Sequence, residues 1–576
     1  MFVLANLFTK IPLDSWVDSG VNWLTNHFSG FFDGVQKGGN TVMNTMTDIL
    51  TAVPIWLFII GMTLIVGVLS HKKWGFPLFT LVGLLIIANQ GLWSDLMNTF
   101  TLVIMASLLS VIIGVPLGIW MSKNEMVNKI VQPILDFMQT MPAFVYLIPA
   151  VAFFGIGVVP GVFASVIFAL PPTVRMSCLG IKQVPTDLVE AAESFGSTGW
   201  QKLFKLELPL AKGTIFSGIN QTLMLALSMV VVASMIGAPG LGRGILSAVQ
   251  GADVGKGFVN GISLVVLAII MDRLTQKINQ TSKQSTTTPK RHWKLWTILA
   301  TLMVMVGTGI VTTITSASSQ KETIKIAYVQ WDSEVASSNV LAQALRQHGY
   351  DVEMTSLDNA IVWQSVANGE ADVSVSSWLP TTHAAQYKKY KDQLDMLGTN
   401  LKGATNGLTV PKYMTDVNSI EDLQNQAGKK ITGIEPGAGI SSLAKDTIKA
   451  YGLDKKGWKL SESSTGAMTV ALGKAIKAKQ EIIVTGWQPH WIFQKYDLKY
   501  LEDPKKAMGS EESIKTIARQ GLKEDKPDAY KALDKFHWTK EDMSSVMLDM
   551  DDGMSPKKAA NKWIKNHQSQ VDSWFK

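Results

Sequence analysis

The amino-acid sequence predicts an α-helical membrane domain fused to a two-lobed α/β domain. The chain has 576 residues, 47% of them hydrophobic, so it is too long for one ordinary domain and too apolar for a wholly soluble protein. Apolar windows without charge recur between residues 49 and 320, as in chains that cross a bilayer repeatedly. From residue 322 onward Lys, Asp and Glu become frequent, and strand-like runs alternate with amphipathic helical runs, which is the pattern of an α/β domain.

Seven windows free of charged residues mark the predicted membrane spans, because an ionised side chain at the bilayer centre costs about 2.5 to 3.5 kcal/mol. The windows are 49–70, 74–94, 96–122, 137–174, 213–242, 257–271 and 295–320. The fourth is long enough for two crossings, with a break near Gly155, Gly157, Pro160 and Gly161. A span needs about 20 apolar residues, so we expect about eight spans.

The distribution of basic residues predicts the orientation, because Lys and Arg accumulate in cytoplasmic loops. The basic segments lie at Lys72 and Lys73, at Lys123 and Lys129, throughout 175–212, and from Arg273 to Lys294. Placing all four inside puts residues 321–576 on the outer face of the membrane. An even number of spans then leaves the N-terminus outside as well.

Residues 1–48 precede the first predicted span. Their aromatic residues, from Trp16 to Phe32, are interspersed with Asp14, Asp18 and Asp33. Such a mixture suits an amphipathic helix lying on the outer leaflet. A mobile leader fits the sequence equally well.

Residues 281–320 combine a basic linker, the last apolar window and a short tether, TSASSQ. A basic start, an apolar core and a small-residue end also describe a secretory signal, whose cleavage would release the C-terminal domain. Because the segment is internal and its apolar run is long enough to span, we favour an uncleaved anchor. The expected domains are therefore 1–48, 49–280 with a cytoplasmic loop at 181–210, 281–320, and 321–576. Within the last domain we expect hinges between the two lobes near 402–410 and near 511–520.

Cysteine, charge and motif content exclude several classes of protein. The single cysteine, Cys178, cannot form an internal disulfide. The net charge of +7 is spread over short loops and a mixed-charge domain, which does not favour nucleic-acid binding. A phosphate-binding GxxxxGKS or GxxxxGKT motif does not occur, because the nearest string, GADVGKG, has the wrong spacing. Since the sequence offers neither a metal-ligand set nor a nucleophile with an orienting acid, we expect no cofactor on this chain, no metal site and no enzymatic activity of its own.

Three tryptophans sit just past strand-like runs of the C-terminal domain: Trp331 after KIAYVQ, Trp378 after ADVSVSS and Trp487 after EIIVTG. In open α/β sheets, ligands bind beyond the carboxyl ends of the strands. Electron-rich indole faces attract a cation that carries no N–H donor, and a desolvated cation–π contact contributes about 2 kcal/mol. The three indoles therefore predict a cage for a quaternary ammonium, whereas a single tryptophan is more often a core residue.

A fourth strand end, KKITGIEPGAGISS, runs through Gly437, Ala438 and Gly439 into a helix that begins near Ile440. Backbone N–H groups at such a junction point at an anion and the helix dipole adds partial positive charge, although glycines also serve ordinary helix starts. His490, in GWQPHW, is either a donor to the same carboxylate or a packing residue. An ammonium cage beside a carboxylate grip describes a trimethylated amino acid.

The loop PTDLVEAAESFGSTGWQKLFKLELPLA covers residues 185–211. It predicts a helix capped near Thr186, a turn at Gly196 and a second amphipathic helix that ends at Pro209. A rigid cytoplasmic element of this kind suits docking into a groove of a partner. The alternative is a loop that only covers the end of the helical bundle.

This loop also carries a resemblance to a known family. Its residues Glu190, Ala191, Ala192, Gly196, Leu208 and Pro209 resemble the EAA motif by which permease subunits of binding-protein-dependent ABC importers engage their ATPase. Leu206 stands where isoleucine is commoner. Together with MPAFVYLIPAVAFFGIG and the tryptophan motifs, residues from about 50 to 576 resemble the OpuA-type glycine betaine importers, in which permease and substrate-binding protein are fused.

The resemblance implies a type I, MetI-like permease and a periplasmic-binding-protein-like domain in a bacterial cell membrane. It implies that Trp331, Trp378 and Trp487 hold the ammonium group, and that the N–H groups of Gly439 and Ile440 and the side chain of His490 hold the carboxylate. The six EAA-like residues then couple the chain to its ATPase. Two copies of the chain are expected to work with two separate ATPase subunits, which bind ATP and magnesium.

The substrate that the resemblance implies is glycine betaine, an osmoprotectant. Proline betaine, carnitine and choline are alternatives, of which choline lacks the carboxylate. From a different functional class, the C-terminal domain could be a membrane-anchored sensor of quaternary ammonium compounds. The EAA-like loop argues against the sensor, because a sensor needs no ATPase.

Overall fold

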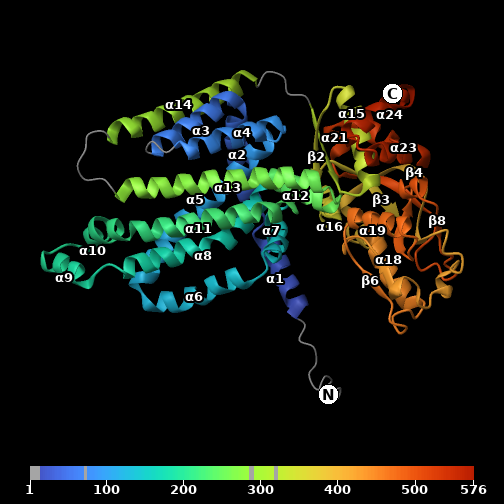
Figure 1. The fold of residues 1–576 in the computed structure, drawn as a ribbon, viewed down its shortest axis with the longest axis horizontal. Helices are drawn as coiled ribbons and strands as arrows, with labels where there is room; N and C mark the ends of the chain where they lie inside the picture. Colours follow the sequence, from blue (N-terminus) through green and yellow to red (C-terminus); the bar gives the residue numbers. More distant parts are fainter. Residues whose placement is uncertain (1–12, 71–73, 284–290, 317–321) are drawn as a thin grey trace, which may run out of the picture. The chain divides into compact units, whose positions relative to one another are not determined.

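The computed structural model describes residues 13–70, 74–283, 291–316 and 322–576. Contacts between Cα atoms divide the chain into two compact units, Met1–Gly242 with Asn260–Ser316, and Arg243–Val259 with Ala317–Lys576. Among the described residues every strand belongs to the second unit, whereas the first is helical (Figure 1). The predicted pairing of a helical membrane domain with an α/β domain is confirmed.

The described residues before residue 317 form helices joined by short turns. They are α1 (Leu13–His27), α2 (Ser29–Ala52), α3 (Ile55–Leu69), α4 (Gly75–Asn89), α5 (Trp93–Lys123), α6 (Glu125–Thr140), α7 (Leu147–Phe154), α8 (Val158–Lys182), α9 (Thr186–Ser194), α10 (Gly199–Lys202), α11 (Leu208–Ser234), α12 (Leu241–Gln250), α13 (Val254–Lys283) and α14 (Arg291–Ser316).

Small side chains let α5, α8 and α11 approach one another closely. A Cβ atom on Gly118 of α5 would lie 2.5 Å from the carbonyl oxygen of Val174 in α8. The hydroxyl oxygens of Thr173 in α8 and Thr222 in α11 are 2.7 Å apart and buried. Close packing of backbones and interhelical hydrogen bonds hold helices together where lipid provides no hydrophobic driving force. These three helices therefore form the centre of the first unit.

Four of the described helices are long and apolar enough to cross a membrane, namely Trp93–Lys123, Val158–Lys182, Gly199–Ser234 and Val254–Asn279. Two bent pairs raise the count to six if each pair is one span: Ser29–Ala52 with Ile55–Leu69, bent by 94°, and Glu125–Thr140 with Ala143–Phe154, bent by 107°. Gly75–Asn89 and Trp296–Thr312 are shorter apolar helices. The expected number of eight spans stays a prediction.

The break expected near residues 155–161 is present, and a second break precedes it. Helix α7 ends at Phe154, and Gly155 (φ 67°) and Gly157 (φ 111°) adopt positive φ angles that glycine takes without steric cost. The chain also bends at Met141, which is extended (ψ 137°) because the residue before a proline avoids the helical region. The part of the window before Gly155 is therefore not one straight helix, as two simple crossings would require.

The prediction that the second helix of the 185–211 loop ends at Pro209 is wrong. Helix α10 continues through a π-helical turn, Leu203–Glu207, into α11, which begins at Leu208 and runs to Ser234. Pro209 lies in the first turn of α11, where a proline is tolerated. The wider π-helical turn before it joins the two helices, so the helical structure continues past the proline.

The described residues of the second unit form nine strands, eight of them in one continuous path. They are β1 (Thr323–Tyr328), β2 (Asp351–Ser356), β3 (Val373–Leu379), β4 (Leu394–Pro411), β5 (Lys430–Thr432), β6 (Lys459–Ser461), β7 (Ile483–Gln488), β8 (Leu498–Tyr500) and β9 (Glu512–Arg519). Their order is β2-β1-β3-β9-β4-β7-β5-β6, with β8 paired to β4. We call the part built on β2, β1, β3, β9 and the first half of β4 the first lobe, and the part built on the second half of β4, β7, β5, β6 and β8 the second lobe.

Helices cover both lobes. They are α15 (Asp332–Gln347), α16 (Asn359–Ala367), α17 (Ala384–Tyr390), α18 (Gly439–Ala450), α19 (Thr465–Lys477), α20 (Ile492–Lys495), α21 (Leu522–Asp525), α22 (Pro527–Lys535), α23 (Lys540–Asp551), α24 (Pro556–Asn566) and α25 (Gln568–Trp574). Among them α15 follows β1 in the first lobe and α18 follows β5 in the second, which is the strand-then-helix order predicted from the sequence.

Strand β4 passes from one lobe into the other without a break. Ala404 pairs with Glu512 of β9, and the next residue, Thr405, pairs with Gln488 of β7. This crossing lies inside the hinge expected at residues 402–410. The second hinge, expected at 511–520, is misplaced, because Glu512–Arg519 is strand β9 of the first lobe. The chain instead crosses between the end of β8 at Tyr500 and the start of β9.

Candidate functional site

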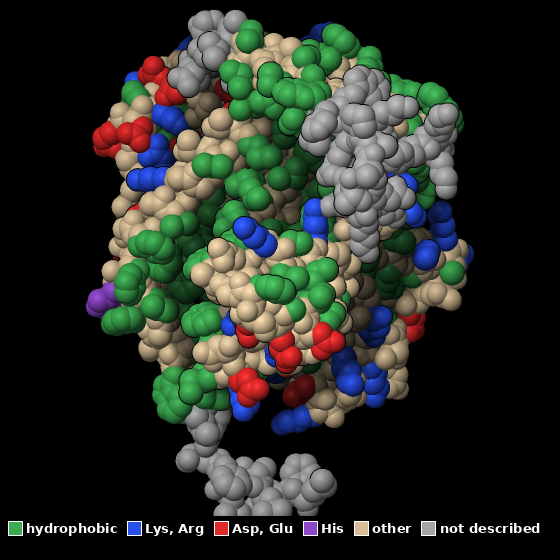
Figure 2. All heavy atoms as spheres, turned by 90° about the vertical axis from the view of Figure 1, so that its left-hand side faces the viewer, with side chains coloured by type: hydrophobic (Ala, Val, Ile, Leu, Met, Phe, Trp, Pro, Cys, Tyr) green, Lys and Arg blue, Asp and Glu red, His purple; other side chains and the backbone are tan. Residues whose placement is uncertain are grey.

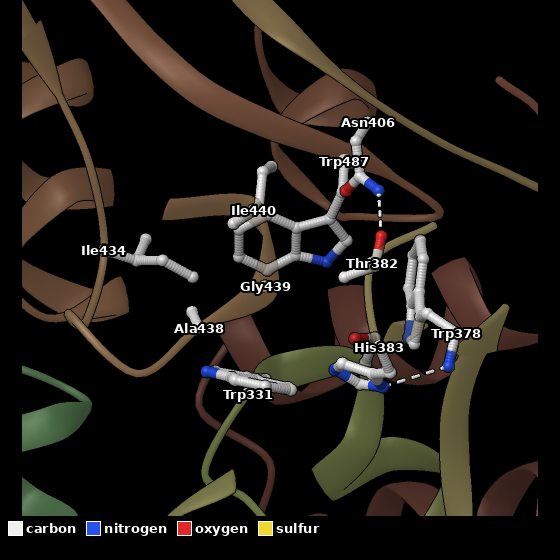
Figure 3. Close-up of a pocket in the computed structure, with 11 residues that line it drawn as sticks. Trp331, Trp378, Thr382, His383, Asn406, Ile434, Ala438, Gly439, Ile440 and Trp487 are labelled. Atoms are coloured by element: carbon white, nitrogen blue, oxygen red, sulfur yellow. Dashed lines mark hydrogen bonds between the residues drawn. The ribbon is translucent and has the colours of Figure 1, made fainter. Parts of the chain in front are cut away.

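A cavity lies in the second unit between its two lobes. Its walls come from the loops and strand ends of both lobes (Figure 3). The lining residues are Trp331, Ser333, Trp378, Thr382, His383, Asn406, Ile434, Ala438, Gly439, Ile440 and Trp487. The structure thus brings together five of the six predicted ligand-binding residues.

The three tryptophans reach the cavity from three separate elements. Trp331 follows β1 and is the N-cap residue of α15. We expected Trp378 and Trp487 to lie just past their strands. They are instead the penultimate residues of β3 and β7. Both strands are prolonged by pairing, Trp378 with Ile514 of β9 and Trp487 with Asn406 of β4.

The indole rings form a box with faces in different planes. In Figure 3 the rings of Trp331 and Trp378 are seen edge-on and that of Trp487 nearly face-on. Their exposed fractions are 8%, 4% and 5%, so each ring is shielded from bulk water. Shielding strengthens a cation–π contact, because the cation and the ring quadrupole then interact in a medium of low dielectric constant.

The N-terminus of α18 forms a wall of the cavity. Gly439 and Ile440 are its first two residues and both are buried. The first N–H groups of a helix have no acceptor within that helix, and the helix dipole is positive at this end. A Cβ atom on Gly439 would lie 2.3 Å from the carbonyl oxygen of Thr382, so only glycine fits here while the lobes are closed.

His490 lies behind Trp487 and is not among the residues that line the cavity. It is 1% exposed, and its ring meets that of Trp487 edge to face with 4.5 Å between the centroids. Its Nδ1 accepts from the N–H of Ile492 at 3.2 Å, so the neutral ring carries its proton on Nε2, which lies 3.4 Å from Oδ2 of Asp332. Burial lowers the pKa of His490 to about 3. Its role as a carboxylate donor stays a prediction.

His383 lines the cavity but was not found from the sequence. In Figure 3 it lies between Trp331 and Trp378, and its Nδ1 accepts from the backbone N–H of Trp378 at 3.1 Å. Burial lowers the pKa of His383 to about 4, so the ring is uncharged near neutral pH. An uncharged ring does not repel a cation held between the indoles. Its position five residues after Trp378 is the one signal that the sequence contained.

Thr382 and Asn406 are two further lining residues that the sequence did not reveal. Thr382 lies in the loop after β3, and Asn406 lies in the middle of the long strand β4. The Nδ2 amide of Asn406 donates to Oγ1 of Thr382 at 2.7 Å (Figure 3). A polar residue inside a strand carries no sequence signal for ligand binding, because its side chain more often faces solvent.

The EAA-like residues lie in the helical unit. Glu190, Ala191 and Ala192 belong to α9, which has no buried residue, and Gly196 (φ 75°) turns the chain toward α10. Leu208 and Pro209 begin α11. This stretch exposes large apolar side chains, namely Leu188 (45%), Phe195 (90%), Trp200 (72%) and Phe204 (57%).

Figure 2 views the molecule from the side on which α9 and α10 lie in Figure 1. Hydrophobic side chains there alternate with acidic and basic ones. Exposed aromatic and aliphatic side chains among charges are typical of a surface that binds another protein. Within the described ranges, no group of three or more His, Cys, Asp or Glu is placed to hold a metal ion.

Comparison with protein families matches both parts of the chain. Residues 322–566 match the substrate-binding domain of ABC-type glycine betaine transport systems, and residues 114–284 match the binding-protein-dependent transport system inner membrane component. The two matches do not overlap, so one chain carries both.

Individual relatives agree with these matches. The glycine betaine/carnitine transport permease protein GbuB of Listeria monocytogenes is 58% identical over 277 residues, which are 47% of this chain and 97% of that protein. The glycine betaine transport system permease protein OpuAB of Bacillus subtilis is 52% identical over 274 residues, 48% of this chain and 96% of that protein. Among solved structures, lactococcal OpuAC in its closed-liganded conformation complexed with glycine betaine is 58% identical, covering 44% of this chain and all of that one, with a TM-score of 0.43.

One buried acid lies close to the cavity without lining it. Glu334, in the first turn of α15, is 2% exposed and accepts from the hydroxyl of Ser374 at 3.4 Å. Burial raises its pKa from 4.5 to about 8. The carboxyl group is therefore largely protonated near neutral pH, and the folded state binds a proton that the unfolded state releases.

This proton predicts a pH dependence of stability. The contribution of Glu334 to the free energy of unfolding is fully present below pH 4.5 and is lost as the pH rises to about 8, because over this range the unfolded chain releases the proton while the buried carboxyl group keeps it. The loss amounts to about 3 to 5 kcal/mol. In thermal denaturation from pH 5 to 9, Glu334→Gln gains stability relative to the wild type as the pH rises. Glu353→Gln, at an exposed position of β2, is the control, and a pH-independent difference for Glu334→Gln would contradict the prediction.

Proposed function

The chain belongs to the family of glycine betaine ABC importers, as a permease fused to its substrate-binding domain, and we propose that it captures glycine betaine outside the cell and conducts it inward. The observation that carries the proposal is the cavity of the second unit, where three indoles face the N-terminus of a helix. One end suits a methylated cation and the other a carboxylate.

The ammonium end of the substrate is held by the box of Trp331, Trp378 and Trp487. A trimethylammonium group cannot donate a hydrogen bond, so its binding depends on charge, dispersion and shape. Each desolvated indole contributes about 2 kcal/mol. Three of them together with the carboxylate contacts account for micromolar affinity, about −8 kcal/mol.

The carboxylate end is held at the N-terminus of α18. The N–H groups of Gly439 and Ile440 donate to it and the helix dipole attracts it. The proposed additional donor is Nε2 of His490, whose ring burial keeps neutral near pH 7. Choline, which lacks the carboxylate, forfeits these contacts, whereas proline betaine and carnitine keep both charged ends.

Transport requires a separate ATPase. We place its docking surface at α9 and the following turn, where Leu188, Phe195, Trp200 and Phe204 are exposed. Glu190, Ala191, Ala192, Gly196, Leu208 and Pro209 position this surface. The working assembly we propose has two copies of this chain and two ATPase subunits, which carry ATP and magnesium.

The binding domain is proposed to lie on the outer face of the membrane, where the basic loops predict it. Of these loops, residues 71–73 and 284–290 lie outside the described residues, as do residues 317–320 of the tether TSASSQ at 315–320. A tether this short keeps the domain at an effective concentration of about millimolar near its permease. Docking then needs no diffusional encounter.

The cage is tested by calorimetric titration of the purified full chain with glycine betaine. Each of Trp331→Ala, Trp378→Ala and Trp487→Ala is expected to weaken binding by about thirtyfold, because one cation–π contact of about 2 kcal/mol is lost. The corresponding Phe variants keep an aromatic face and lose less. Choline competes weakly. Affinity that is indifferent to all three tryptophans, or equal for choline, would contradict the proposed site.

The carboxylate wall is tested by Gly439→Ala. The added methyl group cannot be accommodated 2.3 Å from the carbonyl oxygen of Thr382, so the lobes close incompletely and glycine betaine binds at least tenfold more weakly. Gly437→Ala is the matched control, because its Cβ atom would have Oδ1 of Asp358 at 3.3 Å as its nearest neighbour. Equal affinities of the two variants would show that this contact does not limit closure.

The ATPase surface is tested by Gly196→Val. A β-branched residue is strained at φ 75°, so the turn after α9 shifts and uptake of glycine betaine into cells falls at least tenfold while binding is unchanged. Gly199→Val, where no atom lies within 4 Å of the new Cβ, retains uptake. Normal uptake by Gly196→Val would contradict the placement of the docking surface at this turn. Uptake that does not depend on the chain at all would favour the alternative, a membrane-anchored sensor.

A further inference from the structure

We propose that the hydroxyl group of Thr382 is the latch that holds the two lobes closed over the cavity, and that Thr382 is thereby a positioning residue for the ligand. The inference rests on the proposed function, because it concerns how long bound glycine betaine is retained. It starts from a network of hydrogen bonds that joins the lobes inside the cavity wall.

The first part of the network lies within the first lobe. Glu512 of β9 is 2% exposed. Its Oε1 accepts from the backbone N–H groups of Thr381 at 2.6 Å and Thr382 at 2.8 Å, and its Oε2 accepts from the Thr382 hydroxyl at 2.5 Å. A carboxylate only accepts, so the hydroxyl proton of Thr382 is committed to Glu512. The lone pairs of Oγ1 are then left for a donor on another element.

The second part of the network comes from the second lobe. Asn406 belongs to the half of β4 that pairs with β7, and its Nδ2 donates to Oγ1 of Thr382 at 2.7 Å. Gly439, the first residue of α18, lies against the backbone carbonyl and the methyl group of the same threonine. Two elements of the second lobe thus meet the first lobe at one side chain.

The direction of these bonds gives the latch its strength. The chain of donors runs from Asn406 through the Thr382 hydroxyl to a buried carboxylate, and hydrogen bonds to charged groups are the strong ones. Each bond in such a chain polarises the next. When the lobes separate, the bonds between Thr382 and Glu512 remain, because both residues belong to the first lobe. The acceptor is therefore preorganised before the second lobe arrives.

Other hydrogen bonds also cross between the lobes, but outside the cavity wall. The indole N–H of Trp491 donates to Oδ2 of Asp332 at 2.7 Å, and Nδ2 of Asn359 donates to the carbonyl oxygen of Gly437 at 3.3 Å. Thr382 differs from these residues because it lines the cavity. It lies between the cage, four residues after Trp378, and the carboxylate wall at Gly439. The hydrogen bond between Asn406 and Thr382 therefore forms in the same movement of the lobes that encloses the ligand.

The test compares three variants of the full chain with glycine betaine as the probe. Thr382→Val keeps the shape and removes the hydroxyl, and we expect at least tenfold weaker binding, carried by faster dissociation. Thr382→Ser restores the hydroxyl and most of the affinity. Thr381→Val is the matched neighbour, because the bond from Thr381 to Glu512 uses its backbone N–H. Unchanged dissociation from Thr382→Val would overturn the proposal.

Lobe closure is measured directly by energy transfer between two labels. Cys178 is the single cysteine, so Cys178→Ser supplies a background for Lys391→Cys on the first lobe and Lys455→Cys on the second, both at exposed positions. The Thr382→Val change is expected to raise the open fraction both without and with glycine betaine. A wild-type distribution of distances would contradict the latch, whatever the affinity.

A double-mutant cycle separates the latch from general loss of stability. Asn406→Ala leaves the bonds between Thr382 and Glu512 in place, so it carries the test if Thr382→Val fails to fold. If both residues act through one bond, the two changes together weaken binding no more than the larger one alone. Multiplying effects would overturn the proposal. Failure of the wild type to bind glycine betaine would instead reject the proposed function itself.

Discussion

A cation without N–H groups has to be bound by electric fields and shape alone, and the cavity of the second unit is organised around that constraint. Its indoles supply negative ring faces, and burial holds the pKa of His383, the histidine in the cavity wall, near 4. Desolvation therefore has two effects. It strengthens the attraction between cation and ring, and it keeps the ring of His383 free of positive charge.

The same constraint explains why two lobes are needed. An indole cage on one lobe alone would stay in contact with water, where a cation–π contact contributes only about 0.5 to 1 kcal/mol. Trp331 and Trp378 belong to the first lobe, and Trp487 and the N-terminus of α18 belong to the second. Strand β4, which runs through both lobes, ties them together beside the cavity. Each lobe thus provides half of a dry site that exists only when they meet.

Sequence reasoning found the residues whose roles follow from their place along the chain. The tryptophans and Gly439 stand near strand ends, where ligands of α/β domains bind, and this holds even though Trp378 and Trp487 lie inside their strands. Thr382 and Asn406 were missed, because their roles depend on a contact between separate segments of the chain. His383 was missed because a histidine five residues after Trp378 is a weak signal by itself. The prediction that a helix ends at Pro209 was wrong for a local reason, because a π-helical turn joins α10 to α11 and the helical structure continues past the proline. The close approach of the α5 and α8 backbones at Gly118 likewise could not be predicted from the sequence, because it depends on how the helices pack.

A transport receptor has to release its ligand as well as retain it, and the chemistry of the lobe contacts fits both needs. A buried ion pair between the lobes would leave an unpaired buried charge whenever the pair separated, at a cost of about 3 to 5 kcal/mol. In the network at Thr382 the charged group, Glu512, keeps its three donors on the first lobe, and only a neutral amide has to leave. At this contact, opening therefore breaks one neutral hydrogen bond and the packing against Gly439 but leaves no charge without its donors. An ion pair that does cross between the lobes, Lys495 with Asp551, has a lysine side chain that is 43% exposed, so water replaces the partner when the lobes separate. The contacts between the lobes can thus be broken without leaving an unpaired ion in the core.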